Sequence, residues 1–68
     1  MTVATQVKQT IASLKGVQST LETFASIEEN QKSKAAYHKG AERIKLVVKD
    51  MEQRLSVLEF EEPQYKGF

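Results

Sequence analysis

Residues 37–58 read YHKGAERIKLVVKDMEQRLSVL and carry the most regular apolar pattern in the chain. Alternating steps of four and three residues separate the members of this pattern, which are Tyr37, Ala41, Ile44, Val48, Met51, Leu55 and Leu58. This is the spacing of the a and d positions of a heptad repeat, which share one side of an α-helix but not one side of a strand. The stretch therefore predicts a long helix that buries one stripe against a partner of similar length.

The first half of the chain supplies a suitable partner. Its apolar residues also recur at helical spacing, at Val3, Val7, Ile11, Leu14, Val17, Leu21, Phe24 and Ile27. Residues 28–33 contain no apolar side chain, and Asn30 or Ser33 can cap the helix that follows. We predict a helix over about 3–29, a turn over about 30–33 and a helix over about 34–60. Pro63 disfavours helix at the residue before it, which leaves residues 63–68 as an extended tail after a domain of residues 1–62.

The predicted fold class is all-α, an antiparallel two-helix hairpin. The chain has 68 residues and no cysteine, so neither a large core nor disulfides can stabilise it. Because Val47 falls at g and Leu46 and Phe60 fall at f, the apolar arc of the second helix is wider than one neighbour requires. We therefore expect two hairpins to dimerise into a four-helix bundle. The expected self-association seam consists of Val7, Leu14, Leu21, Phe24, Tyr37, Ile44, Val48, Met51, Leu55 and Leu58.

Each predicted helix also contains a glycine, Gly16 or Gly40, at a cost of about 1 kcal/mol relative to alanine. Gly40 falls at g, beside the seam, where the missing side chain allows another backbone to approach. The pattern gives no packing reason for Gly16.

The sequence shows no catalytic or metal-binding constellation, and we predict a protein that is not an enzyme and has no cofactor. His38 is the sole histidine, and only Glu42 lies one turn away as a second ligand. No Glu-x-x-His pair, nucleophile elbow or glycine-rich phosphate loop occurs. No run of eighteen apolar residues predicts a transmembrane segment, and no secretory signal opens the chain, so we expect a cytoplasmic protein.

Three surfaces are candidates for contacts with other molecules. Outside its stripe the first helix is mostly Gln, Ser and Thr, which are easier to desolvate than Lys and Glu, with only Lys8, Lys15 and Glu22 as charges in its body. The tail has aromatic anchors after its proline and could dock on its own bundle or on a foreign partner, or hold no fixed place; its docking residues are Pro63, Tyr65 and Phe68. The third is a basic patch that could contact nucleic acid or anionic lipid, or be an ordinary solvated face: Lys32, Lys39, Arg43 and Lys49.

The two ends of the chain carry a family resemblance. The opening Met1-Thr2-Val3, the run from Gln6 to Thr10, the run Ala12-Ser13-Leu14-Lys15-Gly16 and the closing segment from Glu61 to Phe68 resemble domain-of-unknown-function family sixteen-fifty-seven of spore-forming Bacillus-type bacteria. The resemblance implies a sporulation context, since such proteins are encoded beside genes of the spore dipicolinic-acid channel and a similar domain is attached to spore inner-membrane proteins. It implies no catalytic residues. The stretch from Lys32 to Lys49 matches the family less closely.

The leading hypothesis is a non-enzymatic helical interaction or structural module of the forespore or spore. It would associate with itself as a homodimer or higher oligomer, and with a spore membrane protein at the periphery of the inner membrane. The alternative is a basic binder of nucleic acid or of an anionic membrane surface, although a net charge of +1 makes nucleic acid an unlikely partner. A small-molecule carrier would need a cavity that this well-filled seam does not suggest.

Overall fold

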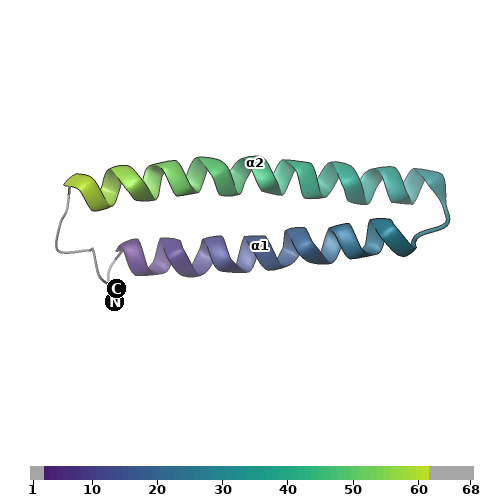
Figure 1. The fold of residues 1–68 in the computed structure, drawn as a ribbon, viewed down its shortest axis with the longest axis horizontal. Helices are drawn as coiled ribbons and strands as arrows, with labels where there is room; N and C mark the ends of the chain where they lie inside the picture. Colours follow the sequence, from purple (N-terminus) through teal and green to yellow (C-terminus); the bar gives the residue numbers. More distant parts are fainter. Residues whose placement is uncertain (1–2, 62–68) are drawn as a thin grey trace.

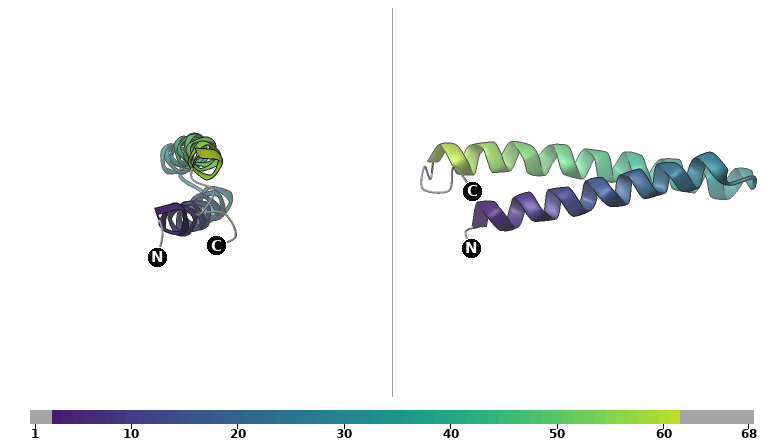
Figure 2. Two further views of the ribbon diagram at one scale, coloured as in Figure 1. Left: turned by 90° about the vertical axis from the view of Figure 1, so that its left-hand side faces the viewer. Right: turned by 60° about the horizontal axis from the view of Figure 1, so that its bottom comes forward.

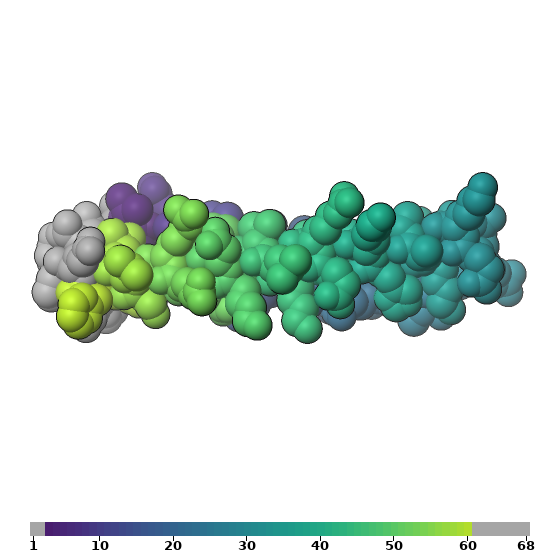
Figure 3. Space-filling view, turned by 90° about the horizontal axis from the view of Figure 1, so that it is seen from above, coloured from purple at the N-terminus to yellow at the C-terminus, as the bar shows by residue number. Residues whose placement is uncertain are grey.

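The structure is a computed structural model that describes residues 3–61 as two antiparallel helices, α1 (Val3–Ile27) and α2 (Gln31–Glu61), lying side by side (Figure 1). The Cα positions extend over 49 × 17 × 12 Å. In the end-on view no further described element covers either helix (Figure 2). Seen from above, α2 covers α1 along most of the rod (Figure 3). The predicted hairpin is thus confirmed for the described residues, whereas a four-helix bundle stays a prediction.

The apolar stripe of α2 faces α1, as the heptad spacing predicts. Ala41 and Val48 are buried, and the remaining members of the stripe from Tyr37 to Leu58 are half-buried. Steps of three and four residues keep these positions on one side of the helix for its whole length. A single neighbouring helix covers that side only in part, which explains why most of the stripe is half-buried.

The predicted stripe of α1 is wrong at four positions. Val3, Val17, Phe24 and Ile27 are exposed. The residues that face α2 instead follow an unbroken heptad alternation: Ala4, Val7, Ile11, Leu14, Gln18, Leu21 and Ala25 are all buried or half-buried. A strict alternation of three and four is needed to stay opposite α2, and the predicted set departs from it with two steps of four from Val3 to Ile11 and with two steps of three at Val17 and again at Ile27.

The turn between the helices is shorter than predicted and lies nearer the N-terminus. α1 ends at Ile27 and α2 begins at Gln31, because the side-chain Oδ1 of Asn30 accepts a hydrogen bond from the backbone N–H of Ser33 at 3.0 Å. The carbonyl of Asn30 also accepts the N–H of Lys34 at 2.9 Å, which closes the first helical turn. Of the two predicted caps, Asn30 is therefore the one used, and residues 31–33 join the helix.

The core of this hairpin is thin. Its buried apolar residues in the described part of the chain are Ala4, Ile11, Ala25, Ala41 and Val48, and no large side chain there is fully buried. Three of the five are alanines, which bury little area. Near the turn, the rings of Phe24 and Tyr37 meet across the two helices with centroids 5.5 Å apart and planes tilted by 59°. The hairpin thus holds its helices together mainly by half-buried contacts.

The first prediction concerns the cap. Replacing Asn30 with alanine removes the acceptor for the Ser33 N–H and should lower the free energy of unfolding by about 1 kcal/mol. Asn30→Asp keeps an acceptor and should stay near wild type. Urea denaturation followed by circular dichroism, at one fixed protein concentration, measures both variants. Equal stability of Asn30→Ala and wild type would contradict the assignment of the cap.

The second prediction compares the two helical glycines. A Cβ at Gly16 would meet no atom within 4 Å, whereas one at Gly40 would lie 3.4 Å from Cδ1 of Leu21. Gly16→Ala should therefore stabilise the chain by about 0.5–1 kcal/mol through helix propensity alone. Gly40→Ala should gain less, because the new methyl group presses against Leu21. A thermal melt that ranks Gly40→Ala above Gly16→Ala would contradict this.

Candidate interaction surface

The seam of the hairpin separates two unlike sides. With Ile11 and Ala41 at heptad position a, the e positions of both helices fall on one side of the seam and the g positions on the other, as in any antiparallel helix pair. We call these the e side and the g side. The e side carries charge at six of its e positions within the helices, at Lys8, Lys15 and Glu22 of α1 and at Lys45, Glu52 and Glu59 of α2, and the other two are the polar residues Gln31 and His38.

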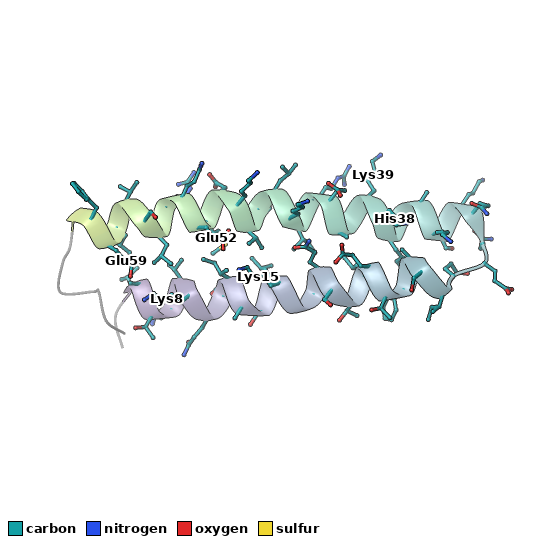
Figure 4. The ribbon with its side chains drawn as sticks, in the orientation of Figure 1. Lys8, Lys15, His38, Lys39, Glu52 and Glu59 are labelled. Atoms are coloured by element: carbon teal, nitrogen blue, oxygen red, sulfur yellow. The ribbon has the colours of Figure 1, made fainter. Side chains whose placement is uncertain are left out.

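Two ion pairs join the helices on the e side. Lys8 Nζ lies 3.1 Å from Glu59 Oε2, and Lys15 Nζ lies 3.1 Å from Glu52 Oε2 (Figure 4). The second pair is reached from the first by moving seven residues along each helix in opposite directions. This confirms that e faces e across an antiparallel seam. Charge complementarity therefore fixes which side of α1 faces which side of α2.

The g side presents apolar residues instead. Exposure follows heptad position: the large apolar residues at g are 43–52% exposed, those at c are 56–70% exposed, and those at f are 66–80% exposed. The g members are Val3, Val17, Phe24 and Val47, the c members are Ile27 and Val57, and the f members are Leu46 and Phe60. The first six share the g side, because c lies next to g on the helix surface.

No charged residue of α1 lies on the g side. The three charges of this helix all occupy e, so its g and c positions hold only apolar and uncharged polar residues: Val3, Gln6, Thr10, Ser13, Val17, Thr20, Phe24 and Ile27. The hydroxyl of Thr10 donates to the Gln6 carbonyl at 3.0 Å, and that of Thr20 donates to the Gly16 carbonyl at 3.0 Å. These donors already have partners within the helix, so covering this face costs less than covering free hydroxyls.

The structure places most of the predicted self-association seam inside the hairpin. Val48 is buried, and eight further members are half-buried between α1 and α2: Val7, Leu14, Leu21, Tyr37, Ile44, Met51, Leu55 and Leu58. Phe24 is the exception and lies at g, exposed on one edge. These contacts build the monomer, and any role of the same residues between two chains stays a prediction.

The predicted anion contacts lie on the outer surface of α2. Lys32, Lys39, Arg43 and Lys49 are all exposed, and Figure 4 shows Lys39 pointing away from α1. Lys32 and Lys39 occupy f, whereas Arg43 at c and Lys49 at b lie on opposite sides of that line. The four therefore spread around the outside of the helix and do not converge on one point.

The described residues offer few other features. A shallow, open depression of about 300 Å³ on the outer surface of α2 is lined by Asp50, Gln53, Arg54 and Val57. Residues 3–61 contain no group of three side chains suited to hold a metal ion, and neither described helix is long and apolar enough to cross a membrane. The predicted docking residues Pro63, Tyr65 and Phe68 lie outside the described residues.

The sequence pattern did not predict that residues of both helices form the g side together. It identified an uncharged face on the first helix but assigned Val17 and Phe24, its central apolar members, to the buried stripe. The signal was present in the sequence: Lys8, Lys15 and Glu22 recur every seven residues, and Val3, Thr10, Val17 and Phe24 recur every seven residues on the other side. Two parallel rows of this kind indicate a helix with a charged side and an uncharged side.

Comparison with known proteins gives one match. The family model described as "Protein of unknown function (DUF1657)" matches residues 7–55, which is most of the chain. The matched segment runs from the seam residue Val7 in α1 to the seam residue Leu55 in α2. Neither the curated proteins nor the solved structures contain a match to the chain.

The third prediction tests the e side. Glu52→Lys places two cations at the Lys15–Glu52 pair, and the swapped double variant Lys15→Glu/Glu52→Lys restores opposite charges. Both side chains are about half exposed, 57% and 47%, so the coupling energy from a double-mutant cycle should be about 0.2–1 kcal/mol. It should shrink in 1 M salt. A coupling energy that does not change with salt would contradict an electrostatic role for this pair.

Proposed function

We proceed from the fact that the chain belongs to the DUF1657 family, and we propose that it is a non-enzymatic helical module that acts by associating with itself and with a protein partner. One observation carries this proposal. Six large apolar side chains are exposed together on the g side of a hairpin that fully buries no large side chain among its described residues. Exposed apolar side chains that gather on one side of a molecule are typical of a protein interface.

The energetics of a small domain support self-association. Each helix of the hairpin has one described helical neighbour, and most of its a and d residues are only half-buried. Domains of this length bury a small share of their surface and commonly need a disulfide, a metal ion or a partner for stability. Covering the g side would give each helix a second neighbour and would convert half-buried seam residues such as Leu14 and Ile44 into core.

Among residues 3–60, whose side chains the structure describes, no polar side chain is buried. Catalysis depends on polar groups that are held in fixed positions in a site that excludes water. His38 is exposed on the e side, and the depression on α2 is open and lined by one helix. We therefore propose that the pattern of burial and charge in this hairpin serves assembly and not a reaction.

We propose a spore as the setting and a membrane protein as the partner. The support is the family resemblance of the sequence, which implies a sporulation context at the inner membrane. On the hairpin itself, Leu46 and Phe60 lie at f on the outer surface of α2, away from both α1 and the g side. These two exposed apolar residues are available to a protein partner after the g side is covered.

The basic surface of α2 favours a second candidate function, the binding of nucleic acid or anionic lipid. Lys32 and Lys39 are exposed at f. Contacts of this kind weaken steeply as salt rises. Binding to a DNA duplex or to phosphatidylserine vesicles in 50 mM salt, lost in 200 mM salt and lost in Lys32→Glu/Lys39→Glu, would support it. No binding of wild type in 50 mM salt would exclude it.

The fourth prediction tests self-association. Gel filtration with light scattering should give wild type a mass of at least twice 7.7 kDa at micromolar concentration. Val17→Glu places a charge in the middle of the g side and should shift the mass toward that of one chain. Ala12→Glu, the matched control, adds the same charge at an exposed b position of the same helix and should leave the mass unchanged.

Circular dichroism of both variants separates loss of assembly from loss of folding. Wild type at the mass of a single well-folded chain would overturn the proposal. Equal dissociation by Ala12→Glu and Val17→Glu would show that the g side is not the interface.

A further inference from the structure

We infer that the g side is covered by the g side of a second copy of this chain, inverted so that the two turns lie at opposite ends of a four-helix bundle. In this arrangement α1 lies on α1 of the second copy and α2 lies on α2. The inference rests on the proposed self-association and adds to it the face, the occupant and the orientation.

The size of the face fits this occupant. The Cα positions of the hairpin extend over 49 Å along its axis and 17 Å across it, so the flat outline of this face, without side chains, covers roughly 800 Å². Stable protein interfaces bury about 800 Å² on each partner. A second hairpin is the same length and width, so it covers the whole face and leaves no overhang of exposed apolar surface on the g side.

The α1 half of the face is suited to burial. It carries no charge, and the hydroxyls of Thr10 and Thr20 already donate to carbonyls of their own helix at 3.0 Å. Covering this half of the face with α1 of a second copy therefore buries no charge and leaves the hydroxyl donors of Thr10 and Thr20 paired. On the e side, by contrast, burial would have to desolvate Lys15, Glu22, Lys45 and Glu52.

The α2 half of the face decides the orientation of the second copy. Its g positions are spaced evenly on either side of Val47, so the charges near them can be compared directly when a copy is inverted. Counting seven residues in each direction from Val47 gives Gly40 and Arg54 at g, and the c positions around it are Arg43 and Asp50. Inverting a second copy about this point brings Arg43 to within one residue, about 1.5 Å along the axis, of the level of Asp50 in both halves of the dimer. Arg54 falls opposite Gly40, which has no side chain and leaves room for the long guanidinium group.

The Asp50 carboxylate can serve both arginines. Its Oδ2 accepts a hydrogen bond from Nε of Arg54 in the same helix at 3.0 Å, and the second carboxylate oxygen can accept a hydrogen bond from another donor. Turning the second copy so that the two turns coincide would instead lay α2 on α1. Arg43 and Asp50 would then face the uncharged row of Val17 and its neighbours, where opposite charges are missing. Charge complementarity therefore selects the inverted dimer.

Single cysteines test the face and the orientation, because the chain has no cysteine of its own. Val47→Cys places a thiol at the centre of symmetry, Ile27→Cys places one on the g side at the turn end, and Ala12→Cys places one on the opposite side of α1. All three positions are exposed, so free thiols react alike with a small reagent, which is measured first. The full-length variants are then treated with a bis-maleimide that spans about 8–10 Å, the distance between packed helix axes.

Covalent dimer from Val47→Cys, at least tenfold more than from Ile27→Cys or Ala12→Cys, is the expected result. Efficient crosslinking of Ile27→Cys to itself would place the turns together and overturn the orientation. Crosslinking of Ala12→Cys without Val47→Cys would overturn the face; in both cases self-association stands. A wild type that is monomeric by light scattering, with no crosslink in any variant, would overturn self-association itself and the inferred dimer with it.

Discussion

One contact holds the described residues together, the seam between α1 and α2. Neither helix has another described neighbour, so the a and d residues set the alignment of the rod and the side of each helix that meets solvent. Because the seam is built from alanines and half-buried aliphatic residues, the area it removes from water is small for two helices of 25 and 31 residues. The exposed apolar rows beside it follow from this shortage, since the seam alone uses only two of every seven positions.

The ion pairs beside the seam help to set the register of the two helices. Gln18 occupies an a position near the middle of α1, the Lys15–Glu52 pair also lies near the middle, and the Lys8–Glu59 pair lies toward the open end. Each exposed pair contributes little energy, yet a slip of α2 by a few residues would separate both pairs at once. The e side therefore contributes to register more than to stability, and because the three charges of α1 all lie on it, the α1 half of the g side carries no charge.

The sequence predicted the parts of this fold that local spacing determines. The alternation from Tyr37 to Leu58 has no competing interpretation, so the stripe of α2 was predicted correctly. In α1 the larger apolar residues Val17, Phe24 and Ile27 suggested a stripe, but burial depends on direction relative to α2, and Ala4, Gln18 and Ala25 have that direction. The turn was predicted too far along the chain, because Asn30 and Ser33 are both suitable N-cap residues and only the folded structure shows which of them caps α2. The g side could not be assembled from one helix, because it needs the relative orientation of both.

The lysines near the turn acquire a further consequence in an inverted dimer. Lys32, Lys34 and Lys39 lie at the turn end of each hairpin, beside Glu28 and Glu29, so the bundle would carry this lysine group at both of its poles and the two poles would be equivalent by symmetry. A rod with two equal poles is a bivalent ligand. Weak attraction of one pole to an acidic surface would be multiplied by avidity when both poles engage, and the length of the helices would then act as a ruler that sets the distance between the two surfaces.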